Sequence, residues 1–424
     1  MTISWEISEL DNGLRVVTTP VPTAQSVSVN VFVGVGSRGE DRSQNGLSHY
    51  LEHMLFKGSQ RWPSTMAIAE TIEGAGGVLN AFTAKEITCY WNQVPFDRLG
   101  LALEVLADMI INPLLDGEEI DRERTVVQQE IKRAHDQPSA WAGELLSRAC
   151  YGDQPIGWPI AGSEETVGGL QRPDFLEHMR RWYTPDNMVL SVAGNTTHQT
   201  LLSMARKLFG GLEASPAPAF EPARDGIPGE NALAESRDIA QCNLGIGLRA
   251  LSRTDPDRYA LMILNTILGR GMSSRLFKEV RERRGLAYAV GSSVSRHNDT
   301  GALVISAGVS PEKLQEAARV ILEEVFKLTE EPVPEEEMVK ARDYTVGTFR
   351  LSLETTMALA HRAGENLLTT AEIEPVEVVV AKLEAVTAED VRRVARRLIR
   401  RDNLAAAVVG PGASQDDLSK LLAA

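Results

Sequence analysis

Two histidines four residues apart, with a glutamate just before the second, form the pattern most typical of chemistry in this sequence: His49, Glu52 and His53. The apolar spacing around them predicts a helix over 46–56. On a helix, residues four apart lie one turn above each other, so both imidazoles can reach one metal ion and Glu52 flanks them. Two neutral imidazoles and a carboxylate are a typical zinc-binding set that leaves a position for water. The alternative is a helix face with exposed or hydrogen-bonded histidines.

Composition limits the classes of protein to which the chain can belong. With 424 residues, 43% of them hydrophobic, two domains are expected, and the net charge of −14 disfavours a nucleic-acid partner. No stretch reaches the roughly 18 uninterrupted apolar residues of a membrane span. The cysteines Cys89, Cys150 and Cys242 are isolated, and the first ten residues lack a basic, apolar leader. We therefore expect a cytoplasmic protein with no membrane or nucleic-acid partner.

The elements that must position the motif follow from periodicity. Asn12-Gly13 between two apolar runs predicts a β-hairpin at the start of the chain. Alternating valines predict a strand over 27–35, and an apolar run predicts another over 188–193. Besides the motif helix, helical spacing recurs over 66–74, 96–111 and 117–135.

A stretch rich in Pro, Ala and Gly at 210–235 divides the chain. It predicts a linker between a catalytic domain at 1–209 and a second domain at 236–424. A weak repeat crosses this linker: 30–35 resembles 243–248, and 51–58 resembles 264–271, both at an offset of 213 residues (243 − 30 and 264 − 51). Such a constant offset indicates duplication of one unit. The alternative is that any two domains of this class share a strand and helix rhythm.

The motif and its surroundings resemble one family of peptidases. His-x-x-Glu-His is the inverted zinc-peptidase motif. Residues 46–58, followed by 77–83, resemble the insulinase (pitrilysin-like) family, and most closely its short bacterial members related to the mitochondrial processing peptidase β subunit. The resemblance covers essentially the whole chain. It implies an α+β fold of two homologous domains, each a mainly antiparallel β-sheet packed with α-helices.

The resemblance also implies the rest of the metal site. In that family a glutamate some 75 to 80 residues after the motif is the third ligand, and Glu130 in the segment 123–131 matches it. Glu123, seven residues earlier and hence on the same helix face, would support the site from behind. Without the resemblance, both would be expected to be solvated helix residues. One zinc ion per chain is implied.

Substrate-handling residues are implied in both halves. Arg281 and Tyr288 match a family pair that donates hydrogen bonds to the substrate, although a basic surface run with a core tyrosine would have the same spacing. An edge strand with Asn80, Ala81, Phe82 and Thr83 would accept an extended peptide as an added strand. For that segment, a plain strand with a core Phe82 is the alternative.

The second half has lost the metal groups. At the offset of 213, the positions of His49, Glu52 and His53 correspond to Met262, Asn265 and Thr266.

The sequence therefore predicts a zinc metalloendopeptidase, similar to processing peptidases, with Glu52 as general base. Its substrates would be short or unfolded polypeptides. Two domains supply half of the family's closed chamber, so a homodimer is expected, unless a related second subunit takes the partner's place. Two other functions stay open: a non-catalytic scaffold or core subunit, and a metal-binding protein without hydrolytic activity.

Overall fold

The computed structural model describes residues 3–216 and 218–423. Positions 1, 2, 217 and 424 fall within the predicted domain and linker ranges and lie outside the described residues. The strands are β1 (Glu6–Glu9), β2 (Arg15–Pro20), β3 (Ser26–Val33), β4 (Val78–Thr83), β5 (Thr88–Pro95), β6 (Met188–Gly194), β7 (Ala232–Glu235), β8 (Cys242–Ala250), β9 (Ala287–Arg296), β10 (Gly301–Val309) and β11 (Leu404–Val409).

The α-helices follow the same chain order. They are α1 (Leu47–Leu55), α2 (Thr65–Gly74), α3 (Leu99–Ile111), α4 (Gly117–Asp136), α5 (Pro138–Tyr151), α6 (Glu164–Gly169), α7 (Arg172–Trp182), α8 (His198–Phe209), α9 (Arg258–Leu268), α10 (Leu314–Glu330), α11 (Glu335–Leu351), α12 (Thr356–Thr370), α13 (Val376–Glu384), α14 (Ala388–Leu398) and α15 (Gln415–Ala423). The expected helix over 96–111 begins only at Leu99, because a 3₁₀ turn occupies Phe96–Arg98. None of the described helices is long and apolar enough to cross a membrane.

The described residues fall into two compact units. Unit 1 comprises those within Met1–Ile131, Pro159–Glu221 and Arg350–Val376, and unit 2 comprises those within Lys132–Trp158, Pro222–Phe349 and Glu377–Ala424. Unit 1 contains a six-stranded sheet in the order β1-β2-β6-β3-β5-β4, and unit 2 a five-stranded sheet in the order β7-β11-β8-β10-β9. Both sheets are mainly antiparallel and are packed with helices, so the predicted α+β fold is confirmed.

The two sheets share one topology. Without β1, the strand order of unit 1 repeats in unit 2 strand by strand. The strand directions repeat as well: β2 pairs with β6 in parallel, as β7 does with β11, and the other pairs are antiparallel. This agreement supports the duplication that the repeated sequence indicated.

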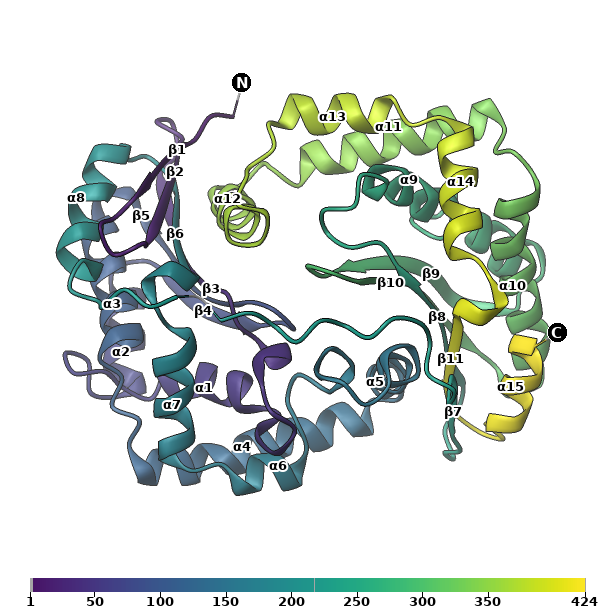
Figure 1. The fold of residues 1–424 in the computed structure, drawn as a ribbon, viewed down its shortest axis with the longest axis horizontal. Coiled ribbons are helices and arrows are strands. Elements are labelled where there is room, and N and C mark those ends of the chain that lie inside the picture. Colours follow the sequence, from purple (N-terminus) through teal and green to yellow (C-terminus); the bar gives the residue numbers. More distant parts are fainter. Residues whose placement is uncertain (1–2, 217, 424) are drawn as a thin grey trace. The chain divides into compact units, whose positions relative to one another are not determined.

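Each sheet is covered by a helix from the opposite half of the sequence. Figure 1 shows α12 beside β3 and β6 in unit 1, and α5 beside β8 and β11 in unit 2. α12 lies so close to its sheet that a Cβ atom at Gly364 would be 2.3 Å from the Phe32 ring. The compact units therefore interleave across the linker predicted at 210–235, whose last residues form β7. The domain ranges 1–209 and 236–424 stay a prediction about the repeated sequence.

A buried carboxylate anchors the start of α1. Gly46, just before the helix, has a φ of 102°, and a Cβ atom there would lie 2.6 Å from the carbonyl oxygen of Ala161. Glu40 accepts hydrogen bonds from the backbone amides of Gly46, at 2.7 Å, and Ser48, at 2.6 Å. Burial raises the pKa of Glu40 to about 7, although these hydrogen bonds act to lower it. The contacts satisfy amides that the start of a helix leaves free, and they fix the turn from which His49 projects.

The inner face of α1 rests on a neutral histidine. The buried His178 of α7 has its Nε2 atom 3.3 Å from the hydroxyl of Ser48. Burial, and then the charge of Arg181, lowers the pKa of His178 from 6.5 to about 3. The folded protein therefore keeps this ring neutral at pH values where the unfolded chain protonates it. The resulting stabilisation is fully present above the unfolded-state pKa and is lost as the pH falls toward the folded-state pKa.

We predict that His178→Gln, which cannot titrate, makes the free energy of unfolding less dependent on pH. Below about pH 6 the wild-type protein should lose about 1.4 kcal/mol per pH unit through this residue alone. Urea unfolding with a chelator present, at several pH values between about 5 and 7, measures the difference in slope between the two proteins. Parallel pH dependences would contradict the prediction.

Candidate metal centre

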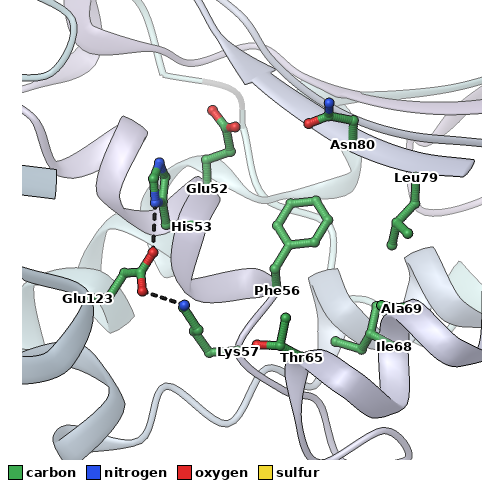
Figure 2. A pocket seen from close by; sticks show the side chains of 10 residues that line it. All are labelled: Glu52, His53, Phe56, Lys57, Thr65, Ile68, Ala69, Leu79, Asn80 and Glu123. Atoms are coloured by element: carbon green, nitrogen blue, oxygen red, sulfur yellow. Dashed lines mark hydrogen bonds and ion pairs between the residues drawn. The ribbon is translucent and has the colours of Figure 1, made fainter. Parts of the chain in front are cut away.

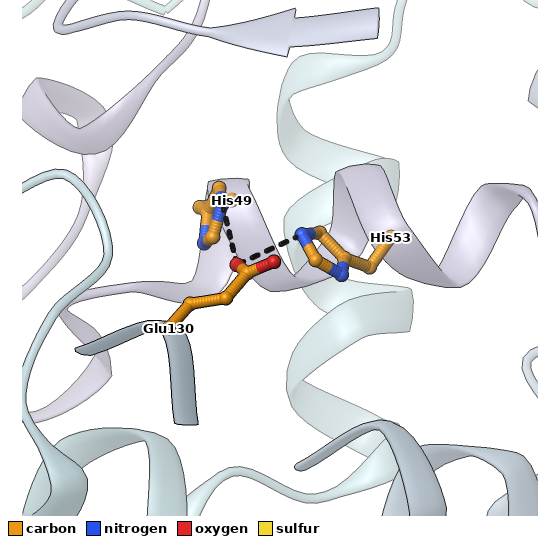
Figure 3. Close-up of side chains that lie close together, drawn as sticks. All are labelled: His49, His53 and Glu130. Atoms are coloured by element: carbon orange, nitrogen blue, oxygen red, sulfur yellow. Dashed lines mark ion pairs between the residues drawn. The ribbon is translucent and has the colours of Figure 1, made fainter. Parts of the chain in front are cut away.

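Three side chains from two helices point toward one another in unit 1. His49 and His53 project from α1 with their ring centroids 4.7 Å apart, and Glu130 reaches them from α4 (Figure 3). The Oε2 atom of Glu130 lies 3.6 Å from Nε2 of His49 and 3.4 Å from Nε2 of His53. The structure thus brings together the three residues that were predicted to bind metal.

The spacing of these atoms fits a zinc ion. Nitrogen and oxygen ligands lie about 2.0–2.2 Å from zinc, so two ligands in tetrahedral positions are about 3.3–3.6 Å apart. The two separations from Glu130, 3.4 Å and 3.6 Å, fall in this range, and all three ligand atoms lie within 4.8 Å of one another. Across the part of the chain that the structure describes, this is the only group of at least three His, Cys, Asp or Glu side chains whose ligand atoms lie within that distance.

A carboxylate and an ammonium group lie behind His53. Glu123 of α4 has its Oε1 atom 2.9 Å from Nδ1 of His53, and its Oε2 atom forms an ion pair with Lys57 (Figure 2). Because this contact occupies Nδ1, the Nε2 atom of His53 is left to face Glu130. Glu123 therefore lies in a position from which it can orient the ring of His53.

The charges around these groups suit a bound cation. Burial, and then the nearby charge of His53, lowers the pKa of His49 to about 4, so the ring is neutral at neutral pH. Burial acts to lower the pKa of His53, but the hydrogen bond to Glu123 and the charge of Glu130 raise it overall. Burial acts to raise the pKa of Glu123, but His53 and Lys57 lower it overall. The surrounding carboxylates supply negative charge that would stabilise a bound cation.

Glu52 lies next to the candidate ligands and accepts a hydrogen bond from a residue of the sheet. Thr83, at the end of β4, donates a hydrogen bond from Oγ1 to Oε2 of Glu52 at 2.5 Å. Burial raises the pKa of Glu52; Thr83 and His53 act against this shift, and Glu130 adds to it. A raised pKa suits a carboxylate that takes up a proton and releases it again near neutral pH.

The strand predicted to bind peptide is an edge strand. β4 is the last strand in the sheet order of unit 1, so it pairs with β5 on one side only. Its side chains divide between the two faces: Ala81 packs against the core that includes α1, whereas Phe82 stacks on His361 of α12 with the ring centroids 5.4 Å apart. Asn80 is exposed. Substrate contact by Asn80, Ala81, Phe82 and Thr83 stays a prediction.

A pocket of about 350 Å³ opens between Glu52, His53 and the edge strand (Figure 2). Leu79 and Asn80 of β4 form part of its wall. The apolar side chains in its lining are Phe56, Ile68, Ala69 and Leu79. Polar and charged side chains, among them Lys57 and Glu123, share this lining, so the pocket is of mixed character.

Arg281 and Tyr288 lie together in unit 2. Arg281 belongs to a π-helix at Phe277–Arg283, a rare conformation that is frequent at functional sites. Its guanidinium carbon lies 4.8 Å from the ring centroid of Phe277 and 5.4 Å from that of Tyr288. Tyr288, near the start of the edge strand β9, is 81% exposed. The alternative of a basic surface run with a core tyrosine is therefore wrong, because Tyr288 lies on the surface.

Polar groups with structural partners stand at two of the three corresponding positions in unit 2. Asn265 and Thr266 lie on α9, the counterpart of α1 in the repeat. Asn265 accepts a hydrogen bond from Ser292 at 2.7 Å, and the hydroxyl of Thr266 lies 2.8 Å from that of Thr345. These contacts hold α9 against its neighbours, which agrees with the predicted loss of the metal site in the second half.

Sequence reasoning missed three partners of the predicted residues. Lys57 follows His53 by four residues, and this spacing could have indicated its place beside Glu123. Phe277 precedes Arg281 by four residues in the same way. No comparable local pattern links Thr83 to Glu52, because their contact depends on how the sheet packs against α1.

Family models and named relatives match both halves of this chain. The sequence model of the insulinase family (peptidase family M16) matches residues 15–164, and that of the peptidase M16 inactive domain matches residues 169–344. The uncharacterized zinc protease YmxG of Bacillus subtilis is 37% identical over 94% of this chain and 97% of its own length. An uncharacterized zinc protease of Mycobacterium tuberculosis is 37% identical over 98% of this chain and 95% of its own.

Solved structures show the same fold at lower identity. A protease from Helicobacter pylori superimposes with a TM-score of 0.89 at 24% identity, over 96% of this chain and 100% of its own. A chain of complex III2 from Candida albicans gives a TM-score of 0.84 at 18% identity, over 98% and 99%. Each half of this sequence matches a model of one family, and relatives named zinc proteases match nearly all of it. The chain belongs to the insulinase family of peptidases, family M16.

Proposed function

We propose that this chain is a zinc-dependent metalloendopeptidase with one zinc ion per chain, held by His49, His53 and Glu130. The observation that carries the proposal is the spacing of the three ligand atoms, 3.4 Å and 3.6 Å from the shared carboxylate oxygen, with Glu52 beside them. A zinc ion supplies Lewis-acid activation of water and of a peptide carbonyl group when it is bound. Glu52 takes the proton from the attacking water and returns it to the leaving amine.

The edge strand accounts for the class of substrate. A peptide that adds to β4 must be extended, so short or unfolded polypeptides bind and folded domains do not. The backbone supplies most of this binding, which tolerates variation in the substrate sequence. A side chain of the substrate enters the pocket beside Leu79 and Asn80. This substrate class is that of a processing-type endopeptidase.

Arg281 and Tyr288 supply hydrogen-bond donors to the peptide. A guanidinium group and a phenol both stabilise a carbonyl oxygen that gains negative charge during attack. The rings of Phe277 and Tyr288 hold the guanidinium group between them, so it is ordered before substrate arrives.

The proposed assembly is a homodimer, in which two copies of this two-domain chain close the chamber. A related second subunit in place of the second copy is the alternative. The proposed location is the cytoplasm, because Cys89, Cys150 and Cys242 are all free thiols.

Two sets of variants should distinguish the loss of zinc from the loss of activity alone. His49→Ala and Glu130→Ala should lose zinc, since each removes a ligand. Glu52→Gln should keep zinc yet lower peptide cleavage by at least about a hundredfold, since it removes only the base. Zinc analysis and digestion of a peptide library measure both, with the exposed Glu118→Ala on α4 as control. Wild-type cleavage by Glu52→Gln would contradict the role of the base and leave a metal-binding function.

Variants in unit 2 should affect turnover and leave zinc unchanged. Arg281→Ala and Tyr288→Phe should each lower kcat by about 10- to 1000-fold, as expected for donors to the transition state. Arg284→Ala, an exposed residue of the same basic run, is the matched control. If both variants keep full activity, the pair does not contact substrate.

Mixed subunits should reveal whether the pair acts between chains. A Glu52→Gln chain co-expressed with an Arg281→Ala chain forms mixed dimers. If the pair acts on the partner's zinc site, each mixed dimer has one intact site, and about a quarter of wild-type activity returns. If the pair acts within its own chain, activity does not return. A fully active monomer in sedimentation would contradict the homodimer.

A further inference from the structure

Thr83 ends the edge strand at a point where the backbone is fixed from several directions. Within the sheet it is paired with Thr88 of β5. Beyond it, the amide of Ala84 donates to the carbonyl oxygen of Ile87 at 2.8 Å, and the amide of Ser37 donates to that of Ala84 at 3.1 Å. The hydroxyl of Thr83 is therefore held in place independently of the substrate.

This hydroxyl points at the proposed base. Thr83 Oγ1 donates to Oε2 of Glu52 at 2.5 Å, which is the short distance typical of a hydroxyl donating to a carboxylate. Phe82, the neighbour of Thr83, faces the other side of the sheet, where it stacks on His361. The side chain of Thr83 thus contacts the catalytic helix, and the side chain before it contacts α12.

We infer that Thr83 is a positioning residue for Glu52, and that its side chain is not a contact to the substrate. The inference rests on the proposed function, in which Glu52 is the general base. A glutamate side chain has several rotatable bonds, and a base must stay within hydrogen-bond reach of the proton that it takes. Because Thr83 donates to Oε2, we assign to the other oxygen, Oε1, the proton from the attacking water.

The same contact links substrate binding to catalysis. A peptide added to β4 lies alongside the strand that holds Glu52, so the position of the scissile bond and that of the base depend on one strand. A displacement of about 1 Å in such a group costs about 100-fold in rate. Removal of the hydroxyl should therefore lower kcat and leave the binding of substrate and zinc unchanged.

Thr83→Val and Thr83→Ser test the inference. Valine keeps the β-branched shape that suits a strand but removes the donor, whereas serine keeps the hydroxyl. We expect Thr83→Val to lower kcat by about 10- to 100-fold with KM and zinc content unchanged, and Thr83→Ser to restore most of the loss. Thr88→Val is the matched control: it removes the same kind of group from the paired position, where the hydroxyl donates to the carbonyl oxygen of Val35 at 2.8 Å.

Each other result overturns the inference. A higher KM with unchanged kcat would make Thr83 a substrate contact, and equal losses in the Val and Ser variants would give it a purely structural role. Wild-type kcat in Thr83→Val would leave it without a role. A wild-type protein that binds zinc but cleaves no peptide would contradict the proposed function instead. In that case a crystal structure of Thr83→Val still decides, because a Glu52 side chain that stays in one ordered position would overturn the inference.

Discussion

A tetrahedral zinc site would require three ligand atoms within about 3.6 Å of one another. The packing of α1 against α4 brings the three candidate ligand atoms within 4.8 Å of one another. A single helix supplies two of them, because His49 and His53 are four residues apart. The third ligand atom comes from α4, so α1 and α4 must pack against each other in a fixed position. The buried hydroxyl of Tyr50 on α1 donates to the carbonyl oxygen of Ile120 on α4. Glu40 fixes the other end of the arrangement by binding the amides at the start of α1.

Sequence could predict those parts of the site that depend on one helix. The spacing of His49 and His53 is a local property, whereas Glu123 and Glu130 were assigned only through the resemblance of their segment to the family. The strand periods likewise predicted β3 and β6, whereas the two sheets were implied by the resemblance. The exchange of α5 and α12 escaped prediction, because helical periodicity shows that a helix has an apolar face but not which sheet that face covers. The contact of Thr83 with Glu52 escaped for a related reason: it joins two elements whose packing no local pattern records.

The two halves keep one scaffold and differ in what the first long helix carries. On α1, polar side chains turn toward ligand positions, and their partners Glu123 and Thr83 orient them. On α9, Asn265 and Thr266 form hydrogen bonds within unit 2. The shared topology therefore carries the candidate metal site once and structural hydrogen bonds once. The edge strand β9 of the second copy carries the exposed Tyr288.

Shared fold does not by itself establish hydrolysis, since one fold carries many functions. The supporting contacts are more informative than the motif. A subunit kept only as a scaffold gains nothing from a buried Glu52, because burial disfavours its charged form. Nor does a scaffold need Glu123 to hold His53 so that its Nε2 atom faces Glu130. A protein that only stores metal would need the ligands and Glu123, but not an acid held beside them by Thr83. The combination of an oriented ligand with an oriented base favours catalysis over both alternatives.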